Sequence, residues 1–421
     1  SILENRKLQE EFMKGKKKID DDHLLQLDDA KTNTTSGNIS SQKPSYYSKL
    51  VKNMGKMGSQ AMAIDQEYEI ANTEMYSGYF QPGCIMSEVQ VLRSSSEWSA
   101  GLRNTENSIL QGYYELIENS KHYIYIENQF FVSKSWTDEE KNKCKHSISD
   151  IVQNQIAYFL RLRIEKAYRD KEKFRVYVFL PLLPGFAGEP EESGTLQIIV
   201  KHTYAGICRN YGLSLIEQLE KIMGDQWKNY IGFYSLRNHA LVNGAPKTEI
   251  IYIHSKLMIV DDTKVLIGSA NINDRSMIGS RDSEFAVIIK ERKEIIDQKT
   301  KRNFLMNGNK YLAANFATSF RRALMGEHLG INPNDPILDD PVSDQLHNFI
   351  IQRANNNTKI YHTVFGCYPD DSYTNINLLQ NAKKEKETED PKAFLNKYMG
   401  LKDKIVGHFV EYPLLFLKEE E

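Results

Sequence analysis

The sequence lacks several features that would assign it to a protein class. Its 421 residues contain no apolar run of 18 or more residues, so no segment is predicted to span a bilayer. Its 54 basic and 56 acidic residues give a net charge of -2, which disfavours a nucleic-acid binder. The four cysteines include no CxxC pair, which argues against a metal finger and predicts free thiols in a reducing, cytoplasmic compartment.

The first part of the chain has the composition of a linker. A lysine cluster at 14–18 precedes three aspartates at 20–22, and a stretch rich in Ser, Thr, Asn and Gln covers 31–45. Such segments bury too little apolar surface to offset the entropy of ordering them. We therefore expect residues 1–85 to be largely disordered. The chain opens on Ser1, without a signal-peptide pattern, and is expected to be a fragment or a processed product.

Beyond residue 86, apolar strands alternate with amphipathic helices. The periodicity predicts strands at 89–92, 123–126, 174–180, 249–260, 264–268 and 284–289. It predicts helices at 104–120, 151–168, 214–222 and 311–325. This alternation indicates an α/β fold with a mixed, mostly parallel sheet flanked by helices on both faces.

One segment carries residues suited to catalysis. His254, Lys256 and Asp261 are followed closely by Ser269 and Asn271. Residues two apart in a strand project from the same face, so we expect the His254 and Lys256 side chains to lie together. A turn at Asp261 would return the chain beside that strand and bring the serine and the asparagine to the same rim. An imidazole, an ammonium, a hydroxyl and an amide are the groups that a phosphoryl centre needs.

A single histidine or lysine is usually structural, but the combined pattern, HxKxxxxD followed by GSxN, is specific. It resembles the HKD motif of the phospholipase D superfamily. Further segments resemble the eukaryotic phosphatidylcholine-specific phospholipases D, namely 123–131 (YIYIENQFF), 174–186, 227–230, 251–284, 361–365 and 413–417. The resemblance is expected to begin near residue 86 and to run to the end. It implies one half of a pseudo-twofold fold.

The resemblance implies a mechanism in which two HKD motifs meet at one phosphate. One histidine forms a phosphohistidine, the other protonates the leaving choline oxygen, and water or a primary alcohol then releases the product. His254 is expected to be the acid. Lys256, Ser269 and Asn271 are expected to hold the phosphate oxygens, and no metal or other cofactor is implied.

Four further residues are expected around these groups. Asp261 belongs to the motif, but it lies past the bend and is expected mainly to tie the turn. Glu284 matches the place where the family has an acid beside the histidine, so it is expected to orient His254. Glu127 and Gln129 follow an apolar strand and are expected to line the substrate pocket.

The motif occurs only once in this sequence. The simplest interpretation is the C-terminal half of a longer phospholipase D, in which residues 1–85 connect the halves, 86–345 form the second HKD half-domain and 346–421 pack on it. Its partners would be the first HKD half, a phospholipid membrane contacted peripherally and a phosphoinositide activator, without nucleic acid. Two alternatives stay open: a dimeric phosphodiesterase acting on DNA, with one HKD motif per chain, and a non-catalytic lipid-binding half.

Overall fold

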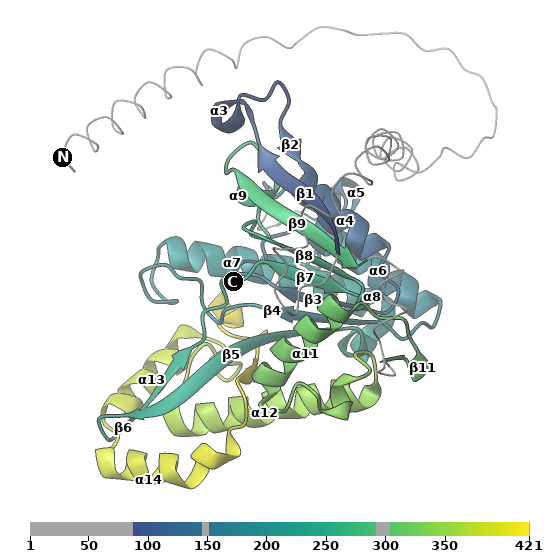
Figure 1. Ribbon diagram of the computed structural model, residues 1–421. Coiled ribbons are helices and arrows are strands. Elements are labelled where there is room, and N and C mark those ends of the chain that lie inside the picture. The colour runs from purple at the N-terminus through teal and green to yellow at the C-terminus, as the bar shows by residue number, and fades with distance from the viewer. Residues whose placement is uncertain (1–86, 145–150, 292–303, 421) are drawn as a thin grey trace, which may run out of the picture. The chain divides into compact units, whose positions relative to one another are not determined.

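A single large mixed sheet organises the part of the chain that is described. The computed structural model describes residues 87–144, 151–291 and 304–420, all within one unit, Gly83–Glu421. The prediction of a linker at 1–85 lies outside these residues. Across the sheet the strands run in the order β12 (Phe409–Glu411), β5 (Ile231–Val242), β4 (Arg175–Phe179), β3 (Tyr123–Glu127), β7 (Leu257–Val260), β8 (Lys264–Gly268), β9 (Glu284–Glu291), β1 (Ser87–Ser95) and β2 (Glu106–Asn107) (Figure 1).

The mixed sheet flanked by helices is confirmed, but its parallel share is smaller than predicted. Only β3 with β4 and β4 with β5 pair in parallel among the described strands. The strands from β7 to β9 form an antiparallel meander, because a three-residue turn joins β7 to β8 and a tight turn permits only an antiparallel neighbour. β6 (Ala245–Ile250) forms an antiparallel hairpin with the far half of β5.

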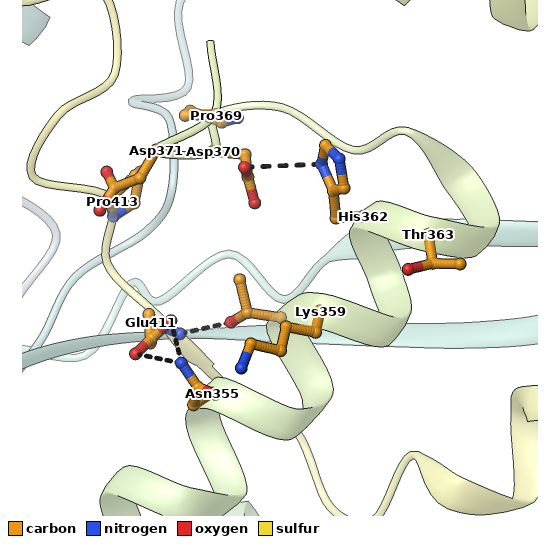
Figure 2. Close-up of a pocket in the computed structure, with 10 residues that line it drawn as sticks. Asn355, Lys359, His362, Thr363, Pro369, Asp370, Asp371, Glu411 and Pro413 are labelled. Atoms are coloured by element: carbon orange, nitrogen blue, oxygen red, sulfur yellow. Dashed lines mark hydrogen bonds and ion pairs between the residues drawn. The ribbon is translucent and has the colours of Figure 1, made fainter. Parts of the chain in front are cut away.

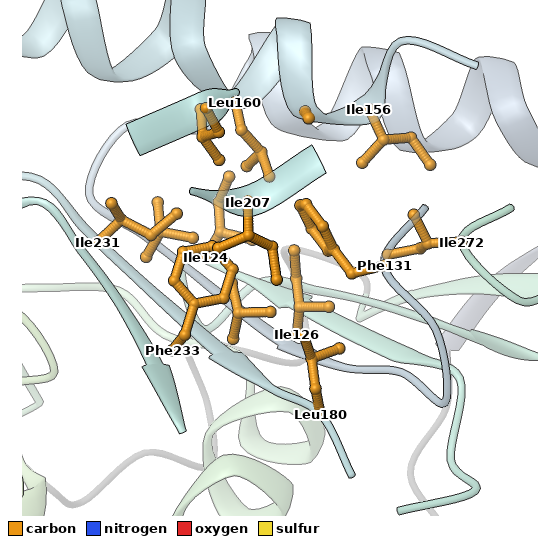
Figure 3. Packing of buried hydrophobic residues seen from close by; sticks show 14 of the residues in the cluster. Ile124, Ile126, Phe131, Ile156, Leu160, Leu180, Ile207, Ile231, Phe233 and Ile272 are labelled. Atoms are coloured by element: carbon orange, nitrogen blue, oxygen red, sulfur yellow. The ribbon is translucent and has the colours of Figure 1, made fainter. Parts of the chain in front are cut away.

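One face of the sheet is covered by helices from the first half of the described chain. These are α4 (Ser108–Glu118), α6 (Ile156–Arg169), α7 (Thr195–Ile207) and α8 (Leu215–Met223). Ile124 and Ile126 of β3 point into this layer, where Figure 3 shows them among Leu160, Ile207 and other apolar side chains. The predicted capping box of α8 is confirmed, because the Ser214 N–H donates to the Glu217 carboxylate at 3.0 Å.

Later helices cover the opposite face of the sheet. α11 (Asn315–Leu329) and α12 (Asp344–Phe365) pack against alternate residues of β3 and β7, among them Tyr125 and Ile259. α14 (Pro391–Leu401) packs against the far end of α12, and the last described strand, β12, joins the main sheet beside β5. The expected cover on both faces is thus confirmed.

The remaining elements are short, apart from α13 (Ile376–Glu387). The short helices are α3 (Glu97–Ala100), α5 (Asp138–Asn142) and α9 (Asp274–Met277). The 3-10 turns are η1 (Gly224–Asn229), η2 (Pro336–Leu338), η3 (Lys402–Lys404) and η4 (Lys418–Glu420), and β10 (Leu305–Met306) pairs with β11 (Asn309–Lys310). No helix within the described ranges is both long and apolar enough to cross a membrane.

The HxK segment does not lie in a strand, so the prediction of a continuous strand over 249–260 is wrong. β6 pairs with β5, whereas β7 pairs with β3 and β8. Residues 251–256 must therefore cross the carboxyl ends of β4 and β3. Neighbouring strands lie about 4.8 Å apart, so a segment that runs across two strand ends cannot keep the hydrogen-bond register of a strand. This crossing places the segment at the edge of the sheet where parallel strands end, which is a common location for sites in α/β folds.

Candidate active site

The crossing segment holds His254 and Lys256 close together but in different environments. Its irregular backbone replaces the expected shared strand face. His254 is exposed, whereas the Lys256 side chain is buried and its Nζ lies 2.6 Å from the His254 carbonyl oxygen. The loop thus folds the ammonium back on its own backbone and leaves the imidazole at the surface.

The Lys256 ammonium keeps one donor for a ligand. It donates to the Gln129 Oε1 at 2.8 Å and to the His254 carbonyl. An ammonium has three N–H donors, so within the described chain one is left. Burial lowers the pKa of Lys256, and the nearby Glu284 carboxylate partly offsets that effect. Gln129 therefore lies beside the motif.

Ser269 and Glu284 lie together where β8 ends and β9 begins. The Ser269 hydroxyl donates to one Glu284 carboxylate oxygen, and the Ser276 hydroxyl donates to the other at 2.6 Å. β8 ends and β9 begins side by side, so the sheet register itself brings the two residues together. The expected hydrogen bond from Glu284 to the His254 ring does not occur between these described residues. The geometry instead makes Glu284 the residue that fixes the Ser269 hydroxyl.

Asn128 joins the loops that follow β3 and β8. Its Oδ1 accepts from the Phe130 and Ile272 N–H groups at 3.1 and 3.0 Å, and its Nδ2 donates to the Ala270 carbonyl at 3.4 Å. Asn271 lies in the loop that is held in this way. Its Oδ1 is buried without a hydrogen-bond partner in the described part of the chain. A buried, unpaired amide oxygen has capacity left for a ligand donor.

Asp261, which was expected among the catalytic residues, lies away from the other residues of the motif. It follows β7 at the opposite end from Lys256, about 16 Å away at the usual rise per strand residue. Its carboxylate accepts from the N–H groups of Lys121, His122 and Tyr123 at 2.7 to 2.9 Å. The expectation that Asp261 ties the turn is confirmed: it fastens the β7–β8 turn to the start of β3.

A buried hydrogen-bond network lies next to the HxK segment, residues 254–256, and the sequence predicted only part of it. Glu127, at the end of β3, accepts from the Ser255 hydroxyl at 2.6 Å and the Tyr125 hydroxyl at 2.5 Å. His328 of α11 contributes Nε2 at 3.0 Å from Glu127 Oε1, across 201 residues of sequence. Burial raises the pKa of Glu127, but the bonds from His328, Ser255 and Tyr125 outweigh it and hold that pKa below its ordinary value. Glu127 is therefore a buried support rather than an open pocket wall.

We expect Glu127→Gln to lower the free energy of unfolding by about 1–3 kcal/mol at neutral pH, because it weakens charge-assisted hydrogen bonds. The depressed pKa means that the carboxylate stabilises the fold above its ordinary pKa of 4.5 and loses this contribution as the pH falls through the folded-state value. Urea unfolding at several pH values should show the gap between wild type and variant shrinking below about pH 4.5.

The exposed Glu115→Gln in α4 is the matched control, and it should leave the gap near zero throughout. If the difference in unfolding free energy between wild type and Glu127→Gln stayed constant down to pH 3 while both proteins remained folded, the role of the charged carboxylate would be contradicted.

Two cavities differ in their relation to this edge. A small one of about 20 Å³ lies beside Gln129, between the apolar residues Phe130 and Pro181. A larger one of about 370 Å³ lies between α12 and the end of the chain, where Figure 2 shows His362 facing Asp370. Neither His254 nor Lys256 lines it. No group of three or more His, Cys, Asp or Glu in the described ranges could hold a metal ion.

Comparison with known proteins matches the chain to one family. A family model described as "Phospholipase D" matches residues 51–249 and 244–367. The chain is 40% identical to Phospholipase D1 of Mus musculus over 86% of this chain and 31% of that protein. It is 42% identical to Phospholipase D1 of Homo sapiens over 81% of this chain and 30% of that protein. It is 41% identical to Phospholipase D zeta 2 of Arabidopsis thaliana over 67% of this chain and 26% of that protein.

The chain thus spans about a third of the length of the curated relatives that it matches. The similarity begins at residue 51, earlier than the expected boundary near residue 86. The family model covers well over half of the residues, and its second match, 244–367, includes His254 and Lys256. The chain belongs to the phospholipase D family.

Proposed function

We propose that the chain is the half of a phospholipase D that carries the second HKD motif. The whole enzyme would hydrolyse phosphatidylcholine to phosphatidic acid and choline, or transfer the phosphatidyl group to a primary alcohol. The observation that carries the proposal is the pairing of an exposed imidazole with a buried ammonium that has one donor unused among the described residues. Such a donor, desolvated on its other sides, is suited to a phosphate oxygen.

The proposed chemistry has two displacements. A histidine from the first half attacks phosphorus, a P–N bond forms, and the P–O bond to choline breaks while His254 gives its proton to the choline oxygen. His254 then takes a proton from water, whose oxygen attacks phosphorus and breaks the P–N bond. Lys256 and Asn271 stabilise the negative charge that develops on the phosphate oxygens in both steps.

The proposal includes the organisation of the chain. Residues 86–345 would form the catalytic half-domain and 346–421 an extension packed on it, with 1–85 as the connector. Contact with a phospholipid surface in the cytoplasm would be peripheral. We include a phosphoinositide activator only because the resemblance to the family implies one.

The alternatives are weaker on the present observations. A nuclease needs a basic surface for the phosphate backbone, whereas this chain has a net charge of -2. A non-catalytic lipid-binding half has no use for a buried ammonium at the site edge, since a buried charge costs free energy.

One experiment with three arms separates these functions. Choline release from phosphatidylcholine vesicles is measured with this chain alone and with this chain plus a polypeptide carrying a first HKD motif, and plasmid nicking is measured in parallel. Release only with both halves supports the proposal. Nicking by the chain alone supports the nuclease, and no activity in any arm supports the non-catalytic half.

Glu284→Ala is expected to lower turnover of the two-half enzyme about 100-fold, because it releases the Ser269 hydroxyl from its fixed position. The free energy of unfolding should change by only about 1 kcal/mol, since Glu284 is half-buried. Choline release and urea unfolding of the same preparations check both values. Asp282→Ala, which removes the carboxylate paired with Arg275, is the neighbouring control. Unchanged turnover in Glu284→Ala would remove this residue from the site.

A further inference from the structure

We infer that Tyr252 is a positioning residue of this site, whose hydroxyl anchors the Gln129 amide in the orientation that holds Lys256. The inference rests on the proposed function for its catalytic consequence. The series of hydrogen bonds that it describes, from the backbone of Gly185 to the Lys256 ammonium, can be tested without an activity assay.

The contacts form an unbroken series. The Gly185 N–H donates to the Tyr252 Oη at 2.9 Å, and the Gln129 Nε2 donates to the same oxygen at 3.0 Å. The other end of that amide, Oε1, accepts from the Lys256 Nζ at 2.8 Å. A loop after β4, a loop after β3 and the HxK segment are therefore joined through one hydroxyl.

The chemistry of the groups determines which one donates and which one accepts in each hydrogen bond. An ammonium only donates, so the Gln129 amide must present its oxygen to Lys256 and turn its NH2 group away. The NH2 group then needs an acceptor, and Tyr252 Oη provides it. Without that hydroxyl, the NH2 group loses the acceptor that fixes it, and the amide can rotate away from the ammonium.

The Tyr252 ring also lies beside the other motif residue. Its centroid is 6.3 Å from that of the His254 imidazole, and the two planes are inclined by 27°. Tyr252 therefore contacts the His254 ring directly and Lys256 through Gln129. One side chain thereby sets the relative placement of the two groups that the motif supplies.

The space at Gly185 is limited by the same tyrosine. A Cβ atom at this position would lie 2.9 Å from the Tyr252 Oη, closer than real Cβ contacts. The backbone of Gly185 does not have a positive φ, so a larger residue here would meet the tyrosine side chain and not an unfavourable backbone conformation. Gly185→Ala should therefore displace the hydroxyl without removing it.

The test measures the titration of Lys256 in the full chain by nitrogen-15 NMR of labelled lysines, with the signal assigned by its loss in Lys256→Met. Tyr252→Phe should weaken the hydrogen bond from the charged ammonium to Gln129. The ammonium should then lose its proton more easily, with an acid dissociation constant about tenfold higher than in wild type. Gln129→Met should do the same, and the double variant should show no further change. Gly185→Ala should shift the titration in the same direction.

Tyr158→Phe in α6 is the matched hydroxyl deletion and should leave the Lys256 titration unchanged. The inference is overturned if Tyr252→Phe leaves that titration unchanged, or if the effects of Tyr252→Phe and Gln129→Met add. In the two-half enzyme, Tyr252→Phe should lower kcat with little change in KM. A correct NMR result without any choline release would overturn the proposed function and not this inference.

Discussion

Replacing Lys256 by methionine is expected to lower choline release by the two-half enzyme about 100- to 1,000-fold, the usual effect of removing one preorganised donor from a charge-stabilising site. Methionine has a similar length and suits a buried position, so the loss should be chemical rather than structural. The buried ammonium has a lowered pKa, which means that its environment disfavours the charge. The free energy of unfolding should therefore stay the same or rise in the variant. Choline release and urea unfolding measure the two effects.

Lys290→Met is the matched control, because Lys290 is an exposed residue of β9. Its turnover should equal that of wild type. A loss of less than tenfold in Lys256→Met would contradict a direct role of the ammonium at the phosphate. A large loss of stability in that variant would instead indicate that Lys256 serves the fold.

The second large effect is expected at the ion pair between Arg321 and Asp262. Both side chains are fully buried, and Nε and Nη2 of Arg321 donate to the two Asp262 carboxylate oxygens at 2.8 Å each. Tyr123 donates to the same carboxylate at 2.5 Å, so β3, the β7–β8 turn and α11 meet here. Arg321→Met leaves the buried carboxylate without its counter-charge and should cost about 3–5 kcal/mol of stability, measured by urea unfolding.

Two variants control this prediction. Arg169→Met removes an exposed arginine of α6 that pairs with Asp170, and it should change stability by less than about 1 kcal/mol. Adding Asp262→Asn to Arg321→Met removes the uncompensated charge and should restore part of the lost stability. A cost below 1 kcal/mol for Arg321→Met would show that the pair does not support the fold.

The sequence predicted the parts of this fold that depend on local pattern. The strand at 123–126 and the capped helix from Ser214 both follow from apolar periodicity and capping chemistry, and both occur in the structure. The motif is recognisable because its spacing is short and its residue types are unusual together, whereas Gln129 was expected at the site because it follows an apolar strand. The role of Asp261 in the turn was also expected, but its partners, the N–H groups of residues 121–123, lie far away in the sequence and were not.

The parts that depend on the three-dimensional path of the chain could not be predicted. The irregular segment 251–256 arises because the chain crosses two strand ends, which only the strand order reveals. His328 meets Glu127 from 201 residues away, and no local signal marks it. Arg321 and Arg322 have the pattern of a solvated helix face, yet both are buried, because Asp262 and Asp339 supply partners from elsewhere in the chain.

The most direct test of the proposed mechanism asks whether His254 supplies the proton to the leaving group. Phosphatidylcholine and a phosphatidyl ester of p-nitrophenol are given to the two-half enzyme carrying His254→Asn. Choline leaves as a poor alkoxide and needs the proton, whereas nitrophenolate does not. We expect no choline release but a burst of one nitrophenolate per site, because the first displacement proceeds and the second lacks its base. Equal loss of both reactions, or choline release at the wild-type rate, would contradict that mechanism.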